Sequence, residues 1–164
     1  FTVVDVAASI ERDEELLSDA LGPRRAAATI ATLESADVIV LVGAADPVGA
    51  ARMIDAAAAI GDLTSAPMIP VVNRMRAGAI GGVDARRQLV GTLERFGGIR
   101  DPILVPLDQA AADRALRTAL PITAAAPRSS ATAALRRLGR IVLERVGADS
   151  AASASTRRGD QARR

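Results

Sequence analysis

Two apolar runs, Val38–Val42 and Met68–Val72, are separated by an alanine-rich segment that is long enough for one helix. Each run is rich in β-branched residues and has the length of a buried strand. Asp46 is a typical helix N-cap residue, Pro47 suits the first helical turn, and Gly61 is a plausible helix stop. Two strands joined by a helix form a βαβ unit, so this stretch predicts a pair of parallel strands.

The rest of the chain continues the alternation of strands and helices. The run Phe1–Val6 predicts a first strand, and Arg24–Ser35 predicts a helix before the βαβ unit. Beyond the unit we expect a helix from Asp84 to about Phe96, a strand at Ile103–Val105, a helix from about Gln109 to Ala119 and a helix from about Ser129 to Val146. This order predicts an α/β fold, an open and mostly parallel sheet of at least four strands flanked by helices.

The composition divides the chain into two segments. Residues 1–146 contain every expected strand and helix and form one partial α/β domain. Residues 147–164 are mainly alanine, serine and arginine, and we expect a disordered basic tail because they bury little apolar surface. Without this tail, 17 arginines stand against 17 acidic residues, so the body is balanced in charge. Because Phe1 begins inside an expected strand and is not a methionine, we also expect that an amino-terminal part of the protein is missing.

The absent residue types exclude several kinds of chemistry. The sequence has no histidine or cysteine, and all 21 basic residues are arginine. A Ser-His-Asp triad, a Schiff-base lysine and a His/Cys zinc site are therefore excluded within this chain. Carboxylates, arginines, hydroxyls and amides remain, and phosphate chemistry is the class that this set serves best. The lack of cysteine, signal peptide and membrane-spanning run predicts a soluble, cytoplasmic protein.

Ligands of open parallel sheets bind at the carboxyl ends of the strands. Asp5 stands near the end of the first expected strand, as a carboxylate that holds a Mg²⁺-bound water would, although a turn aspartate has the same position. Asn73 ends the second run of the βαβ unit, and its amide suits the donor and acceptor of a purine edge or an Asx turn. Arg74 follows it and could lie over a base, reach a phosphate or remain solvated.

The loop after the last expected strand also contributes to this edge. Pro106 and Leu107 could form a wall beside a base, and Asp108 is either part of that wall or a helix cap. The chain has no phosphate-binding Walker A loop, because such a loop requires a lysine.

Four features together resemble the carboxyl-terminal half of the ParA/MinD-type ATPases, a SIMIBI-class group of P-loop NTPases with a deviant Walker A loop. Phe1–Asp5 is similar to the strand that ends in the Mg²⁺-water aspartate, and Leu33–Asp46 is similar to the family's central unit. Val71–Arg74 is similar to the asparagine motif that reads adenine, and Val105–Asp108 is similar to the loop beside the base. Within the group, the chain looks closest to the actinobacterial, pilus-associated CpaE-like branch.

The resemblance implies binding of ATP and Mg²⁺, ATP-driven homodimerisation and slow hydrolysis in the positioning of a chromosome, plasmid or pilus. It assigns a catalytic and water-mediated metal role to Asp5, and nucleotide contacts to Asn73, Arg74 and Pro106–Asp108. DNA and a pilus or secretion machinery are the implied partners, whereas a membrane is not expected. The sequence departs from the family in lacking the phosphate-binding amino-terminal half and in having Val6–Ser9 where a Thr-Pro-Pro-Gly motif is usual.

Three hypotheses follow. The chain is half of an ATPase that needs its amino-terminal part for activity, and residues 1–164 alone then neither bind ATP tightly nor hydrolyse it. Alternatively, it is a degenerate, non-catalytic regulator of the same fold. The third hypothesis is a weak DNA-binding protein that uses its arginines and basic tail.

Overall fold

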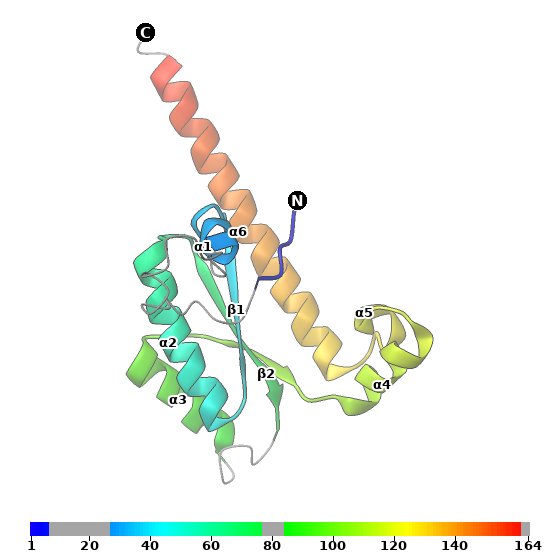
Figure 1. The fold of residues 1–164 in the computed structure, drawn as a ribbon. Helices are drawn as coiled ribbons and strands as arrows, with labels where there is room; N and C mark the ends of the chain where they lie inside the picture. The colour runs from blue at the N-terminus through cyan, green and yellow to red at the C-terminus, as the bar shows by residue number, and fades with distance from the viewer. Residues whose placement is uncertain (7–26, 77–83, 162–164) are drawn as a thin grey trace, which may run out of the picture.

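The computed structural model describes residues 1–6, 27–76 and 84–161, and residues 148–161 as helical backbone only. In chain order the elements are α1 (Ala27–Glu34), β1 (Ile39–Ala44), α2 (Pro47–Leu63), β2 (Met68–Met75), α3 (Ala85–Gly97), β3 (Ile103–Pro106), α4 (Gln109–Thr118), α5 (Ile122–Ala125) and α6 (Ser130–Gln161). The three strands form one open sheet in the order β1-β2-β3, and both strand pairs are parallel (Figure 1). The fold is therefore α/β, with helices on both faces of the sheet.

The central βαβ unit confirms the sequence prediction. A side-chain oxygen of Asp46 accepts a hydrogen bond of 2.7 Å from the backbone N–H of Gly49, and Pro47 is the first residue of α2. The predicted stop at Gly61 is wrong, because α2 continues to Leu63. Leu63 is half-buried against the cluster that contains Ile60, and this packing favours one more turn of helix.

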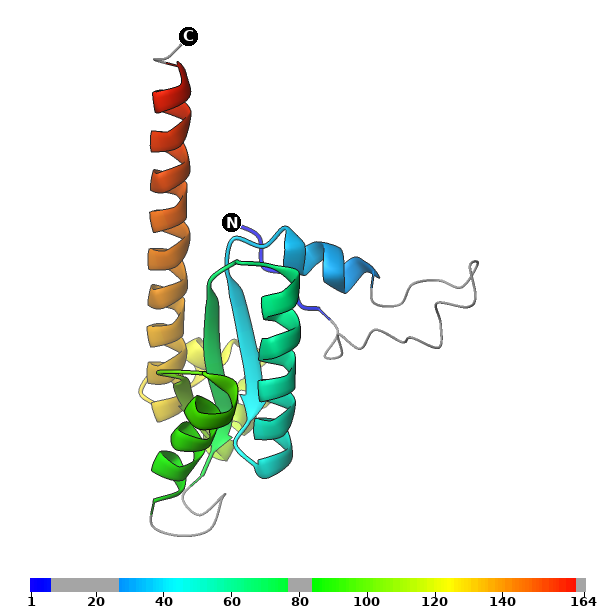
Figure 2. The same ribbon diagram turned by 90° about the vertical axis from the view of Figure 1, so that its left-hand side faces the viewer.

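The two faces of the sheet bury different side chains. On one face, Val72 packs with Met53 of α2 and with Leu89 and Leu93 of α3. On the other face, Ile69 and Val71 of β2 and Ile103 and Val105 of β3 pack with Ala131 and further apolar residues of α6. The alternation along β2 follows from the pleat, which points successive side chains to opposite faces. Figure 2 shows α2 and α6 on opposite sides of the strands.

Residues 1–6 differ from the expectation of a first strand. They carry no regular secondary structure, and Phe1, Val3 and Val4 are exposed to solvent. Within the described residues the sheet accordingly has three strands rather than the four that we expected. The β propensity of Phe1–Val6 is a local preference, whereas a strand forms only when a neighbouring strand pairs with it.

The predicted helix boundaries agree with the structure at some ends and differ at others. α3 ends as expected, with Gly98 in the left-handed conformation donating its N–H to the carbonyl of Glu94. The start expected for the first helix at Arg24 lies outside the described residues. A short helix, α5, was not predicted.

The carboxyl-terminal helix is longer than the sequence predicted. We expected it to end near Val146 before a disordered tail, yet α6 continues to Gln161 and its last turns extend past the sheet (Figures 1 and 2). The residues beyond Val146 contain no proline, and their alanines and arginines are good helix formers, so the sequence permits the helix to continue. The inner face of α6 consists of apolar residues at helical spacing, and Leu135, Leu138 and Ile141 pack against the sheet.

Candidate functional site

The carboxyl ends of the three strands lie at one edge of the sheet, as the parallel pairing requires. Backbone hydrogen bonds continue beyond the strands. The N–H of Ala45 donates to the carbonyl of Asn73 over 2.9 Å, and the N–H of Leu107 donates to the carbonyl of Met75 over 3.0 Å. The segment after β1 is thus fixed beside Asn73, and the segment after β3 beside the end of β2. The prediction that these three segments share an edge is confirmed.

An irregularity in β2 lies at this edge. The pairing of β2 with β3 is interrupted between Val72 and Met75, and Arg74 has a left-handed backbone with φ 61°. The side-chain oxygen of Asn73 accepts a hydrogen bond of 2.8 Å from the N–H of Arg74. Bulges of this kind re-aim side chains and are frequent beside functional sites. The sequence analysis did not predict this irregularity. The observed bond is not the expected Asx turn either, because an Asx turn uses the N–H two residues on, whereas the Asn73 oxygen accepts from the N–H of the next residue.

The hydrogen bond fixes the orientation of the Asn73 amide. A backbone N–H can pair only with the amide oxygen, so the oxygen points to Arg74 and the amide nitrogen keeps both of its hydrogens for other partners. Both side chains are exposed at the edge. Among the described residues the Asn73 amide nitrogen donates no hydrogen bond, so it is available as a donor together with the second lone pair of the oxygen.

The loop after β3 combines an apolar surface with a capped helix. Pro106 is half-buried and Leu107 is partly exposed beside the end of β2. A carboxylate oxygen of Asp108 accepts a hydrogen bond of 3.0 Å from the N–H of Ala111 and caps α4. The capping alternative for Asp108 is thus confirmed, and one of its carboxylate oxygens is engaged in this hydrogen bond.

Asp5 does not join this group in the way that the sequence predicted. It is exposed and belongs to a segment without secondary structure, so no strand carries it to the carboxyl edge. Within the described ranges, no cluster of three or more carboxylate or other ligating side chains could hold a metal ion. The structure brings together Asn73, Arg74 and Pro106–Asp108, but not Asp5.

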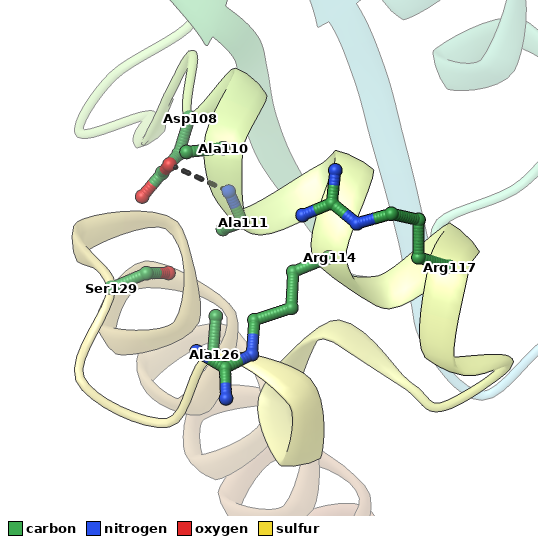
Figure 3. Close-up of a pocket in the computed structure, with 7 residues that line it drawn as sticks. All are labelled: Asp108, Ala110, Ala111, Arg114, Arg117, Ala126 and Ser129. Carbon is green, nitrogen blue, oxygen red and sulfur yellow. Dashed lines mark hydrogen bonds between the residues drawn. The ribbon is translucent and has the colours of Figure 1, made fainter.

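A shallow depression of about 370 Å³ lies behind the Asp108 cap, between α4 and the residues that precede α6. Figure 3 shows the residues that line it: Asp108, Ala110, Ala111, Arg114, Arg117, Ala126 and Ser129. The side chain of Arg114 extends from α4 toward Ala126. The Ser129 oxygen is already engaged, since it accepts a hydrogen bond of 3.0 Å from the N–H of Thr132.

The charges of residues 1–146 are distributed unevenly along the sequence. Residues 1–106 contain ten arginines and fourteen acids, whereas residues 107–146 contain seven arginines and three acids. The two ion pairs of the described residues, Arg87–Asp84 at 3.6 Å and Arg100–Glu94 at 3.4 Å, both belong to the first part. The balance expected for the body thus conceals a basic part formed by α4, α5 and the first half of α6.

Comparison with known proteins identifies no family for this chain. No protein-family model matches the sequence, and no curated protein is similar to it at a significant level. In the portion of the chain that the structure describes, no helix is both long enough and apolar enough to cross a membrane.

Proposed function

We propose that this chain is the base-binding, carboxyl-terminal half of an ATP-dependent positioning ATPase of the ParA/MinD type. The observation that carries the proposal is the placement of Asn73, Arg74 and Pro106–Asp108 at one edge of a parallel sheet. Nucleotides bind at this edge in open α/β sheets. The proposed larger protein has a P-loop NTPase-like sheet of four or more strands, of which β1, β2 and β3 are a part.

The described residues fit the base of ATP. The free amide hydrogens of Asn73 complement a ring-nitrogen acceptor of adenine, and the second lone pair of its oxygen complements the exocyclic amino group. Leu107 and Pro106 offer apolar surface to a flat ring, and Arg74 supplies a guanidinium group that stacks on it or contacts a phosphate. In this arrangement the edge orients the base and discriminates adenine from guanine.

The same residues do not fit the phosphates and Mg²⁺. No lysine exists in the sequence, and Asp5 lies in an exposed segment without regular secondary structure. A Gly- and Lys-rich loop from an amino-terminal part would have to supply this half of the site. We therefore derive no hydrolysis step from residues 1–164, and we expect this chain alone to be inactive.

Nucleotide titrations test the proposal. We expect residues 1–164 to show neither micromolar binding of Mg-ATP nor hydrolysis, and the chain extended by its upstream coding sequence to bind Mg-ATP. In the extended chain, Asn73→Ala should weaken ATP binding about tenfold or more, because it removes hydrogen bonds to the base. Thr92→Ala, an exposed change on α3, serves as the control and should leave the affinity unchanged.

Two results would contradict parts of this proposal. Micromolar ATP binding by residues 1–164 alone would show that the site is complete without an upstream part. An extended chain that lacks a phosphate loop and binds no ATP would favour the alternative of a non-catalytic regulator with the same fold.

The charge polarisation favours a second candidate function, weak binding to the phosphate backbone of DNA. The arginines of residues 107–146 form no ion pair in the described part of the chain, and Arg137 and Arg140 lie exposed on α6. A gel-shift assay over a salt series tests it, because phosphate contacts weaken as salt rises. Binding that persists without residues 148–164 and is reduced by Arg137→Glu with Arg140→Glu places the contacts on the body. Loss on tail deletion alone would place them on the tail.

A further inference from the structure

The depression behind the Asp108 cap is formed by one continuous stretch of the chain. It lies between α4 and the segment that precedes α6, and all of its lining residues fall within positions 108–129. Three of them are the alanines Ala110, Ala111 and Ala126, so no large side chain fills the hollow from these positions. The shape of this surface is therefore set by residues that the structure describes.

Two arginines of α4 give the depression a positive charge. Arg114 and Arg117 both line it, and they are three positions apart, so they lie on the same side of the helix. Figure 3 shows both side chains extending over the depression, with the carboxylate of Asp108 apart from them. Neighbouring like charges on a helix repel each other, so this pair destabilises α4 unless a negative charge joins it.

The carboxylates nearest in sequence do not neutralise these two arginines. One oxygen of Asp108 caps α4, and Asp113 accepts a hydrogen bond of 3.0 Å from the side-chain amide of Gln109. Among the residues that the structure describes, neither Arg114 nor Arg117 forms an ion pair. Two guanidinium groups that line one hollow, while the nearby acids bond elsewhere, indicate a site for an anion.

We propose that this depression binds the phosphate group of a small phosphorylated ligand between Arg114 and Arg117. A guanidinium group matches phosphate with two parallel hydrogen bonds, and one phosphate group has enough oxygens to accept from both arginines. The three alanines leave space for the rest of the ligand beside the helix. The inference does not rest on the proposed nucleotide function, because this site uses neither Asn73 nor Arg74.

A small ligand suits this surface better than a DNA backbone does. The two arginines lie beside a hollow that is bounded by α4 and by the segment before α6. The phosphates of DNA repeat along the strand, so a duplex is bound by a row of basic residues on an open surface. Arg137 and Arg140 on α6 are exposed and fit that second description. Binding of DNA phosphates is therefore the alternative outcome that the experiment must distinguish.

Calorimetric titration of residues 1–164 with sodium pyrophosphate, at constant ionic strength, tests the proposal. The chain has no lysine and thus no phosphate loop, so the nucleotide site contributes no signal. We expect one saturable site with a dissociation constant of about 0.1–1 mM, because two charge-assisted pairs at an exposed surface bind weakly. This affinity agrees with the expected lack of micromolar binding of Mg-ATP.

Three variants distinguish the depression from general attraction to a basic protein. Arg114→Gln and Arg117→Gln should each weaken pyrophosphate binding about tenfold or more, since each removes a charged donor. Ala110→Leu should also weaken binding, because it fills the exposed rim of the hollow without changing the charge. Arg86→Gln is the matched control, since it removes one exposed charge from α3, and it should leave the affinity unchanged. Circular dichroism checks that all four variants are folded.

Amide NMR spectra recorded during the same titration locate the ligand. We expect the shifted resonances to lie within residues 108–129, and we expect Arg114→Gln to leave the gel shift with duplex DNA unchanged. Absence of a saturable site in the natural chain would overturn the proposal. Equal weakening by Arg114→Gln and Arg86→Gln would do the same, because the attraction would then be unspecific. Shifts centred on Arg137 and Arg140 would instead assign the phosphates to the open face of α6.

Discussion

Gly49 in the first turn of α2 lies so close to the end of β1 that a Cβ atom on it would overlap the carbonyl oxygen of Ala44. The helix can approach the strand this closely only because residue 49 has no side chain. The same turn is held by the Asp46 cap, whose acceptor oxygen binds the N–H of Gly49. The contact therefore fixes where α2 starts relative to the carboxyl edge of the sheet.

Gly49→Ala should destabilise the protein by about 1–3 kcal/mol, because backbone atoms must move to admit the methyl group. Urea unfolding followed by circular dichroism measures the change. Gly91→Ala on α3 is the matched control, since a Cβ there meets no atom within 4 Å. The control should gain about 0.5–1 kcal/mol from helix propensity. Equal stability changes in the two variants would refute the close contact.

Because α3 and α4 both end at a residue with a left-handed backbone, we expect exchanges between glycine and alanine at these two residues to have opposite effects on stability. Ala119 has φ 50° at the end of α4, and Gly98 has φ 62° at the end of α3. A left-handed backbone strains any residue with a Cβ, so Ala119→Gly should stabilise and Gly98→Ala should destabilise, each by about 1 kcal/mol. The two midpoints of urea unfolding should move in opposite directions. A shift in the same direction would contradict the conformations assigned to these helix ends.

The aspartates before α2 and α3 predict unequal losses of stability. Asp46→Ala removes a capping hydrogen bond of 2.7 Å and should cost about 1 kcal/mol. Asp84 precedes α3 but makes no side-chain capping bond, and its ion pair with Arg87 is exposed. Asp84→Ala should therefore cost less than Asp46→Ala. Thermal unfolding of both variants under identical conditions provides the comparison, and a larger loss for Asp84→Ala would contradict the observed caps.

A buried hydroxyl ties α5 to the start of α6. Thr132 is fully buried and donates a hydrogen bond of 2.8 Å to the carbonyl of Ala126. Thr132→Val keeps the shape but removes the donor, and it should cost about 1 kcal/mol, because the hydrogen bond of the buried hydroxyl is lost while the Ala126 carbonyl still accepts from the N–H of Ser129. Thr92→Val, on the exposed face of α3, is the control and should change stability by less than about 0.5 kcal/mol. Calorimetric unfolding distinguishes the two outcomes.

The candidate site was predicted in part. Three strand ends share an edge because parallel pairing demands it, and the caps at Asp46 and Asp108 follow from residue type and position. The left-handed backbone of Arg74 could not be predicted, because arginine has no preference for that conformation. It lies where the pairing of β2 with β3 is interrupted between Val72 and Met75, and this interruption depends on strand pairing rather than on local sequence.

The sequence by itself determined the βαβ unit, the parallel direction of β1 and β2, the apolar face of α6 and the exclusion of lysine, histidine and cysteine chemistry. These features depend on local periodicity, capping and composition, which neighbouring residues encode. Only the tertiary structure decided that Phe1–Val6 forms no strand within the described residues and that β2 is irregular between Val72 and Met75, where Arg74 has a left-handed backbone. Strand pairing depends on residues far apart in the chain, so no local pattern can specify it.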